Sequence, residues 1–364
     1  MFATLAGGYS RQPLPAQPDL LGSAEADLLE GRLDAAGFQD VADNYVREIL
    51  NEMAVIELGI VGDGGVRARD RELPWIDGLE GLSVAGVTTL PDGEAVSRPA
   101  AKGPVRWAGP ISVRDWQFAD RETDLFVKQM LLGPYTLAAL AEPAPGRRRE
   151  RLAIELGEAL NAELHALAAA GCPMVEIDEP LAMTIADDGA EWLTFRAAGE
   201  RLIAGLDAEG SPHLSLGLWG GQVHPAGYSS LLGLAYKSYL VDVLAGPSAW
   251  RFIAAVPPER GVIAGVADVQ TITLDEHEVI VWAMAWAAQG ERGANRVGVA
   301  PNGSLCFVDR HFAHRKAQRL GEAVKIASMG PLQEVAEALD EDPLKSKMAE
   351  LRTMAQAVEA GRSS

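Results

Sequence analysis

Two adjacent carboxylates, Asp178 and Glu179, end a short apolar segment that begins at Met174. The apolar residues up to Ile177 predict a buried strand, and Pro180 prevents that strand from continuing. Both acids therefore fall at the carboxyl end of a strand, where α/β folds place their catalytic groups. The alternative is structural, because acids in a core often cap the next helix or pair with an arginine.

Short apolar segments recur along the chain, and amphipathic helical patterns separate them. Strands are predicted at residues 2–5, 55–61, 127–131, 174–177, 213–216, 238–243, 262–266 and 296–300. Eight strands that alternate with helices favour a closed parallel barrel over an open sheet. The predicted fold class is therefore α/β, a single (β/α)8 TIM barrel.

Residues 66–124 interrupt this alternation, since they hold many Gly and Pro and only weak strand signals. We expect an elaborated loop region here, inserted after the second strand on the face where barrel loops build the site. Residues 330–364 are charged and have a helical pattern. The predicted organisation is one barrel over residues 1–329, followed by a C-terminal helical tail at 330–364.

Polar residues at these segments would meet on one rim of such a barrel, although they are distant in sequence. Its acidic character favours a cation, an amine or a metal ion over a phosphate group. His213 could equally be a core histidine, because it follows Pro212 and opens an apolar strand. The rim residues are Asp63, Gln129, Asp178, Glu179, His213, Ser215, Asp242, Asp268, Gln270 and Asn302.

Four of these residues form the predicted acidic centre, because three consecutive strands would deliver them to one pocket. They are Asp178, Glu179, His213 and Asp242. Burial among like charges is expected to raise the pKa of at least one carboxyl, since two close acids resist ionising together.

Charge and cysteine content limit the classes of partner. A net charge of -19 opposes binding to nucleic acid or to an anionic membrane. Cys172 and Cys306 cannot build a disulfide framework, so a reducing cytoplasm is the expected location. The first residues lack the pattern of a signal peptide, and no apolar stretch is long enough to span a bilayer. We expect a small-molecule substrate, and homo-oligomerisation stays open.

Seven sequence blocks, in order, resemble the catalytic barrel of cobalamin-independent methionine synthase and its short paralogues, within the uroporphyrinogen decarboxylase-like superfamily. Together they span residues 1 to about 325, and the IDEP and GPYT motifs are the most specific. The resemblance implies a TIM barrel and places Tyr135 of the GPYT motif among the substrate-binding residues. The blocks are TLAGGY at 4–9, IVGDGG at 60–65, KQMLLGPYT at 128–136, VEIDEP at 175–180, HLS at 213–215, GVADVQ at 265–270 and VAPNG at 299–303.

The resemblance also implies a zinc ion, which in that family is held by a histidine, two cysteines and a glutamate and activates the substrate thiol. His213 matches the histidine, and Asp242 could replace the glutamate. Ser215 and Gly303 stand where the family has cysteines. Because serine is a poor zinc ligand and glycine offers no side chain, we expect no tightly bound zinc, with His213 and Asp242 as weak metal candidates.

Further departures affect substrate binding. Gly65 replaces an acid that grips the amino-acid substrate in the family, and Gln270 replaces a histidine near the folate, whereas Asp178, which faces the substrate amino group, is retained. The implied function is methyl or alkyl transfer to an unidentified small acceptor, with methyl-folate as candidate donor. The catalytic candidates are His213, Asp242 and Asp178. A metal-free lyase or decarboxylase and a non-catalytic binding protein are the alternatives.

Overall fold

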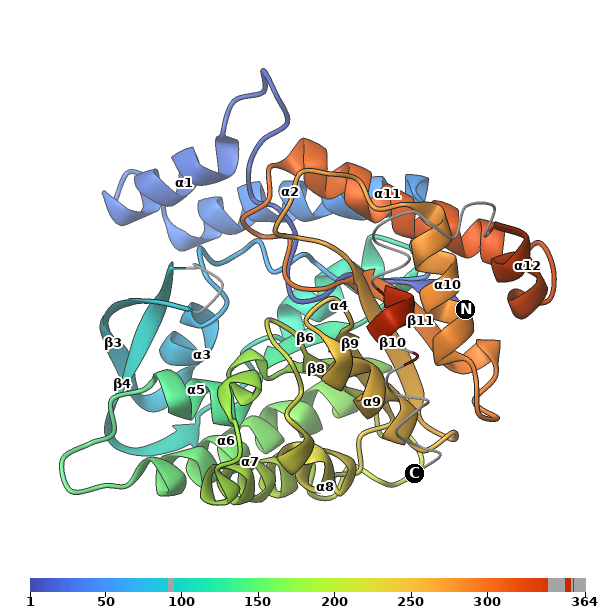
Figure 1. Ribbon diagram of the computed structural model, residues 1–364. Coiled ribbons are helices and arrows are strands. Elements are labelled where there is room, and N and C mark those ends of the chain that lie inside the picture. The colour runs from blue at the N-terminus through green and yellow to red at the C-terminus, as the bar shows by residue number, and fades with distance from the viewer. Residues whose placement is uncertain (91–94, 340–350, 355, 357–364) are drawn as a thin grey trace.

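A parallel sheet of seven strands forms the centre of the computed structural model, which describes residues 1–90, 95–339, 351–354 and 356 (Figure 1). The order across the sheet is β1-β11-β10-β9-β8-β7-β6, and every neighbouring pair is parallel. These strands are β1 (Phe2–Ala3), β6 (Gln129–Leu132), β7 (Met174–Asp178), β8 (His213–Leu218), β9 (Ser238–Asp242), β10 (Gly261–Ala267) and β11 (Val297–Pro301).

A second, two-stranded parallel sheet pairs β2 (Ile60–Val61) with β5 (Phe126–Val127). Only Lys128 separates β5 from β6, and the Gly59 amide donates a 3.0 Å hydrogen bond to the carbonyl of Ala3, the last residue of β1. The structure thus has the predicted α/β class and a parallel half-barrel, with β2 beside it. The strand expected at residues 55–61 is shorter than predicted, because the preceding helix runs to Val55.

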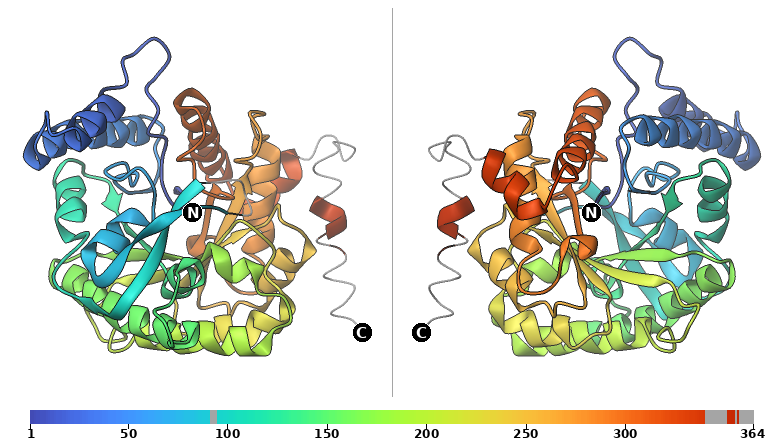
Figure 2. Two further views of the ribbon diagram at one scale, coloured as in Figure 1. Left: turned by 90° about the vertical axis from the view of Figure 1, so that its left-hand side faces the viewer. Right: turned by 90° about the vertical axis from the view of Figure 1, so that its right-hand side faces the viewer.

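Helices surround the sheet, as the three views in Figures 1 and 2 show. The long helix α2 begins after Asp34, whose carboxylate accepts a hydrogen bond from the Gly37 amide, and it buries Phe38, Ala42 and Tyr45 at helical spacing. No helix among the described residues is long and apolar enough to cross a membrane. The helices are α1 (Leu20–Leu29), α2 (Ala35–Val55), α5 (Pro134–Leu140), α6 (Arg149–Ala169), α7 (Gly189–Leu202), α8 (Tyr228–Leu232), α9 (Pro247–Ala255), α10 (His277–Ala287), α11 (Arg310–Ala327) and α12 (Leu332–Leu339).

The predicted C-terminal helical tail is described only in part. Helix α12 covers its first portion, and its apolar face packs on α10 and α11. Residues 340–350, 355 and 357–364 of this tail lie outside the described residues. The boundary predicted at residue 330 stays a prediction.

The region predicted as an elaborated loop at 66–124 is more ordered than expected. It contains α3 (Leu73–Gly78), an antiparallel hairpin of β3 (Leu79–Thr89) and β4 (Ala95–Trp107), and α4 (Val113–Arg121). The buried Glu163 of α6 fixes the end of this region, since its carboxylate accepts hydrogen bonds from the Trp107 indole and from the amides of Ile111 and Ser112, all within 2.9 Å.

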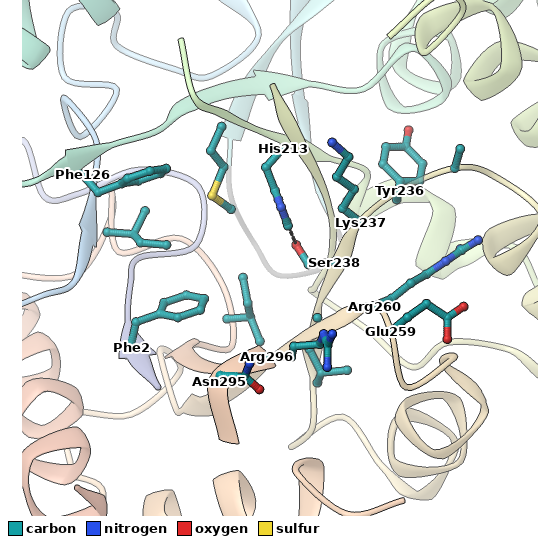
Figure 3. A pocket seen from close by; sticks show the side chains of 16 residues that line it. Phe2, Phe126, His213, Tyr236, Lys237, Ser238, Glu259, Arg260, Asn295 and Arg296 are labelled. Atoms are coloured by element: carbon teal, nitrogen blue, oxygen red, sulfur yellow. Dashed lines mark hydrogen bonds between the residues drawn. The ribbon is translucent and has the colours of Figure 1, made fainter. Parts of the chain in front are cut away.

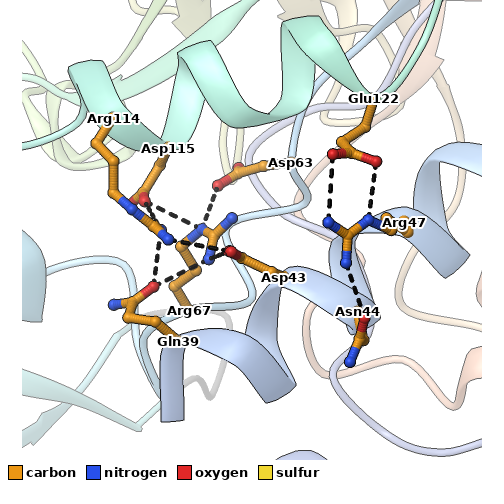
Figure 4. Close-up of polar contacts among 9 residues, drawn as sticks. All are labelled: Gln39, Asp43, Asn44, Arg47, Asp63, Arg67, Arg114, Asp115 and Glu122. Atoms are coloured by element: carbon orange, nitrogen blue, oxygen red, sulfur yellow. Dashed lines mark hydrogen bonds and ion pairs between the residues drawn. The ribbon is translucent and has the colours of Figure 1, made fainter. Parts of the chain in front are cut away.

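An ion-pair cluster fixes the same region on its other side (Figure 4). The guanidinium of Arg67, only 8% exposed, lies within ion-pair distance of Asp43 on α2 and of Asp115 on α4. It also stacks over the Phe118 ring at 5.1 Å. Because Arg67 forms ion pairs with acids on both α2 and α4, it holds residues 66–124 against helix α2.

Residues of the central strands alternate between the helices and the interior of the half-barrel. In β7, Val175 and Ile177 pack in the large core with the helices. Glu176 lies on the opposite face and forms a 2.6 Å ion pair with Lys128, and both side chains are at most 1% exposed. The Lys128 ammonium also donates to the Leu5 carbonyl at 2.6 Å.

We expect Lys128→Met to destabilise the fold by about 3–5 kcal/mol, because it leaves Glu176 charged and unpaired in the interior. The double variant Lys128→Met/Glu176→Leu should recover much of the loss, since it removes both buried charges. The measurement is the shift of the urea unfolding midpoint. Arg148→Met serves as control, because Arg148 is 85% exposed in its ion pair with Glu150. Equal shifts for the single and double variants would contradict the account.

Candidate active site at the carboxyl ends of the strands

Two hollows open where the central strands end. The larger is a cavity of about 1170 Å³, and its lining includes Trp219, Asp242, Gln270, Asn302 and Gly303. The smaller is a pocket of about 100 Å³, and its lining includes Asp63, Arg71, Gln129, Asp178 and Cys306. Parallel strands point their carboxyl ends to one rim, so both hollows lie where this class of fold builds active sites.

Asp178 is the last residue of β7 and is 3% exposed. Its Oδ1 atom accepts a 3.0 Å hydrogen bond from the indole of Trp219, which follows β8. Burial raises the pKa of Asp178 well above its ordinary value, and the nearby charge of Glu176 raises it further. Asp178 can therefore exchange a proton near neutral pH, or ionise fully when a cation arrives beside it.

Asp242 ends β9 and lies in the wall of the larger cavity. Its Oδ1 atom accepts hydrogen bonds from the amides of Leu244 and Ala245, at 3.0 and 3.1 Å, and from the Asn302 side-chain amide at 3.3 Å. Burial raises the pKa of Asp242 to about 7, and these hydrogen bonds oppose the shift. A carboxyl of that pKa is suited to accept or give a proton at neutral pH.

Glu179, adjacent to Asp178 in sequence, caps the amino end of helix α5. Its carboxylate accepts hydrogen bonds from the amides of Tyr135 and Thr136, at 3.0 and 2.7 Å, and from the Thr136 hydroxyl. Gly133 permits this approach, because a Cβ there would lie 2.1 Å from the Glu179 carboxyl carbon. The capping alternative describes Glu179 best, although burial also raises its pKa to about 7.

Tyr135 is turned away from both hollows. Its hydroxyl donates to Glu191 at 2.8 Å, and its ring packs edge-on against Phe195. Neither Tyr135 nor Glu179 is among the described residues that line the two hollows. Their assignment to substrate binding gains no geometric support.

The prediction that His213 shares a pocket with Asp178 and Asp242 is wrong. His213 is the first residue of β8 and pairs in register with Met174, whereas Gly217 pairs with Asp178. Four residues of strand, about 13 Å, separate the two levels. His213 therefore lies at the amino ends of the strands, where its Nε2 atom contacts the Ser238 hydroxyl at 2.8 Å.

Ser215 lies between these levels, opposite Glu176 in the strand register, and is fully buried. It lines neither of the two hollows among the described residues. Its position therefore gives no support to the predicted contact with substrate, because its side chain is fully buried.

The other predicted residues divide between the two hollows. Asp63 and Gln129 line the smaller pocket, and Asp63 also accepts a hydrogen bond from the Gly65 amide at 2.9 Å. Gln270 and Asn302 line the larger cavity. Asp268 supports the loop there, since its carboxylate accepts a 2.9 Å hydrogen bond from the Gln270 amide.

Several site residues were missed by the sequence analysis. Trp219 borders the larger cavity and contacts Asp178, while the Arg71 guanidinium stacks over its ring at 4.6 Å. The signal was available, because Trp219 continues the every-second-residue series of His213, Ser215 and Gly217. His224, in the loop beyond, also lines the larger cavity.

The side chains present do not fit the zinc ion that the resemblance implies. No group of three or more His, Cys, Asp or Glu among the described residues could hold a metal ion. His213 and Asp242, the two matched candidates, belong to opposite ends of the strands. At the level of Asp178 the neighbouring strand offers Gly217, where a Cβ would lie 2.3 Å from the Asp178 Oδ1 atom.

A family model described as the catalytic domain of cobalamin-independent synthase matches residues 21–213, more than half of the chain. The chain belongs to this family. Family membership agrees with the resemblance drawn from the sequence blocks, and it places Asp178 within the matched region.

Curated relatives of this family are much longer than the aligned part of the chain. Proteins named 5-methyltetrahydropteroyltriglutamate--homocysteine methyltransferase from Cronobacter sakazakii and Salmonella arizonae are each 28% identical over 156 residues, which is 42% of this chain and 21% of the relative. The matched stretch thus spans about a fifth of their length.

Solved structures of the family share the fold over most of the chain. A B12-independent methionine synthase from a Shewanella species, in complex with selenomethionine, aligns with a TM-score of 0.73 at 19% identity and covers 89% of this chain and 97% of that one. A putative vitamin-B12 independent methionine synthase from Listeria monocytogenes aligns with a TM-score of 0.69 at 14% identity, over 94% and 100% of the two chains. At these identities the similarity establishes the fold.

The raised carboxyl pKa values predict how stability changes with pH. Asp242 and Glu179 titrate near 7 in the fold, against about 4 in an unfolded chain. Between these values the native state binds more protons, so the stabilisation is full below about pH 4 and is lost as pH rises through about 7. We expect the urea midpoint to fall over this range and to fall less in Asp242→Asn. Asp207→Asn, an exposed control, should keep the wild-type slope.

Proposed function

We propose that this protein transfers a methyl group from a methyl-folate to a small acceptor that carries a protonated amine, without zinc. The observation that carries the proposal is Asp178, a buried carboxyl at the end of β7 in a half-barrel of the cobalamin-independent synthase family. The names of the curated relatives support a methyl-folate donor, because they describe transfer from 5-methyltetrahydropteroyltriglutamate.

The smaller pocket is suited to the amino end of the acceptor. Its lining includes Asp63, Asp70, Asp115 and Asp178, against the cations of Arg67 and Arg71. An arriving ammonium group would favour the ionised form of Asp178 and lower its pKa toward the ordinary range. A volume of about 100 Å³ admits a small polar group rather than a whole cofactor. The pocket therefore supports recognition of an amine.

The larger cavity is suited to the donor and to the reacting atoms. Its volume of about 1170 Å³ is at the upper end of ordinary ligand sites, which span about 300–1,000 Å³. Trp219 borders this cavity and also donates a hydrogen bond to Asp178. Trp219 is thus a neighbour of both hollows. An acceptor held by its amino end in the smaller pocket would place its other end in the larger cavity, beside the donor.

Asp242 is the proposed proton acceptor. In the transfer the acceptor's nucleophilic atom loses its proton to the Asp242 carboxylate and forms the new bond to the methyl carbon. The bond between that carbon and the folate nitrogen breaks, and the nitrogen takes up a proton as the reduced folate leaves. A carboxyl with a pKa near 7 suits this role, and general base catalysis of this kind contributes about 10²–10⁴-fold.

Two asparagine variants test these roles separately. Asp242→Asn should lower kcat by about 10²–10⁴-fold. Asp178→Asn should chiefly raise KM for the amine-bearing acceptor, because the counter-charge is removed. The assay follows labelled methyl from methyltetrahydrofolate to a panel of amino thiols and amino acids. Asp207→Asn is the matched control, since it makes the same change at an exposed position.

The pH profile distinguishes a base from a structural group. The wild-type rate should rise as pH increases through about 7, because Asp242 must be ionised to accept the proton. This dependence should disappear in Asp242→Asn. Acceptor turnover that needs no methyl-folate and releases carbon dioxide would instead support a decarboxylase and contradict the proposal.

Metal content tests the zinc part of the proposal. Protein purified without chelator should hold zinc at well below one atom per chain, because the described side chains supply no tight tetrahedral set. Elemental analysis of wild type and Asp242→Asn makes the measurement. Zinc near one atom per chain that is lost in Asp242→Asn would show that a site forms around this carboxylate.

A further inference from the structure

A third cavity opens at the opposite, amino ends of the strands (Figure 3). Its volume is about 560 Å³, within the ordinary range for small-molecule sites. The first residues of several strands line it, among them Phe2, Ile60, Phe126, Met174, His213 and Ser238.

This cavity is separate from the candidate active site. Met174 lines it at the start of β7, whereas Asp178 lines the smaller pocket at the end of the same strand. The intervening length of strand is about 13 Å. The buried Lys128–Glu176 pair also lies between these two levels, because Glu176 is midway along β7. A ligand here would not reach Asp178 or Asp242, which line the hollows at the carboxyl ends of the strands.

One part of the lining is apolar and partly open to solvent. Phe2, Ile60 and Phe126 come from three different strands. Phe2 and Phe126 lie on the same side of the cavity in Figure 3. Phe126 is 45% exposed, so a large part of its ring is open to solvent beside the cavity. A hydrocarbon or aromatic group placed there would remove this surface from water and gain stability from its burial.

The polar part of the lining is positively charged, against the overall charge of the protein. Lys237, Arg260 and Arg296 line the cavity together with one acid, Glu259, in a chain with a net charge of -19. Arg260 has a structural role, since its guanidinium donates hydrogen bonds to the carbonyls of residues 232 and 234 and to the Tyr239 hydroxyl.

Lys237 is differently placed. It is exposed, and the described residues provide its ammonium with no hydrogen bond or ion pair. Beside it, the His213 imidazole contacts Ser238, and burial together with the charge of Lys237 lowers the pKa of His213 to about 4. The imidazole is therefore neutral at physiological pH and adds a polar contact without a second charge.

We propose that this amino-end cavity binds a small organic anion with an apolar body, its carboxylate beside Lys237 and its hydrocarbon part against Phe2 and Phe126. The charge of the lining selects an anion, and the three apolar side chains select a hydrophobic body. This inference is independent of the proposed methyl transfer, because none of its residues takes part in that step.

The test is calorimetric titration of the whole protein with phenylbutyrate, and with phenylbutanol and phenylbutylamine as uncharged and cationic analogues. Phenylbutyrate should bind most tightly of the three. Lys237→Met should weaken its binding about three- to fivefold, the effect of one partly exposed ion pair. Phe126→Ser should weaken all three probes, because it removes apolar contact area. Lys102→Met is the matched control, since Lys102 is exposed on the hairpin.

Three outcomes would overturn the proposal. These are no saturable binding of phenylbutyrate up to about 10 mM, equal affinity for the anion and the amine, and equal loss of affinity in Lys237→Met and Lys102→Met. Binding by Asp178→Asn should match the wild type, and its loss there would place the ligand in the active site instead. Because Lys237 and Phe126 are exposed, unfolding midpoints should show that their variants remain folded.

Discussion

The buried ion pair between Lys128 and Glu176 is the interaction on which the rest of the interior depends. Both charges are almost fully buried, and each makes a further bond to the segment after β1: Lys128 to the Leu5 carbonyl and Glu176 to the Gly7 amide. The pair thus joins β7 to the residue between β5 and β6 and to the segment after β1. It also acts on the site, because the charge of Glu176 adds to burial in raising the pKa of Asp178. Structural stability and the protonation of Asp178 are consequently linked.

The strands could be predicted from the sequence. Whether a given residue lies toward the amino or the carboxyl ends of the neighbouring strands could not. All eight predicted segments contain strand residues, because apolar runs between helical patterns are a strong signal. His213 and Asp178 each lie in such a run, yet they occupy opposite ends of neighbouring strands. The apolar pattern predicts which face of the sheet a residue lies on. It does not predict the residue's position along the barrel axis, since strand register depends on pairing with a distant segment. The histidine therefore belongs to a cavity that the sequence analysis did not anticipate.

Asp178 and Glu179 show a second limit. The sequence marks them as a pair, but consecutive residues at a strand end point to different surroundings. Glu179 completes the start of α5, and Asp178 faces the smaller pocket. The two strands β3 and β4 were predicted as part of a loop for a related reason. Their alternation is weak, and the contact that fixes the end of β4 comes from Glu163 on α6, far away in sequence.

Burial suits Asp242 to the proposed proton-transfer role in a site whose described side chains do not fit the zinc ion that the family resemblance implies. A thiolate-bound zinc supplies a strong fixed charge, whereas an aspartic acid in water is ionised at neutral pH and a weak base. Enclosing Asp242 raises its pKa to about 7 and so increases its basicity, while three hydrogen bonds limit the destabilisation. At Asp178 burial likewise raises the pKa, and the hydrogen bond that the Trp219 indole donates to the carboxylate opposes that rise. The same burial that suits Asp242 to act as a base makes its carboxyl a source of pH-dependent instability, because its pKa is raised relative to the unfolded chain.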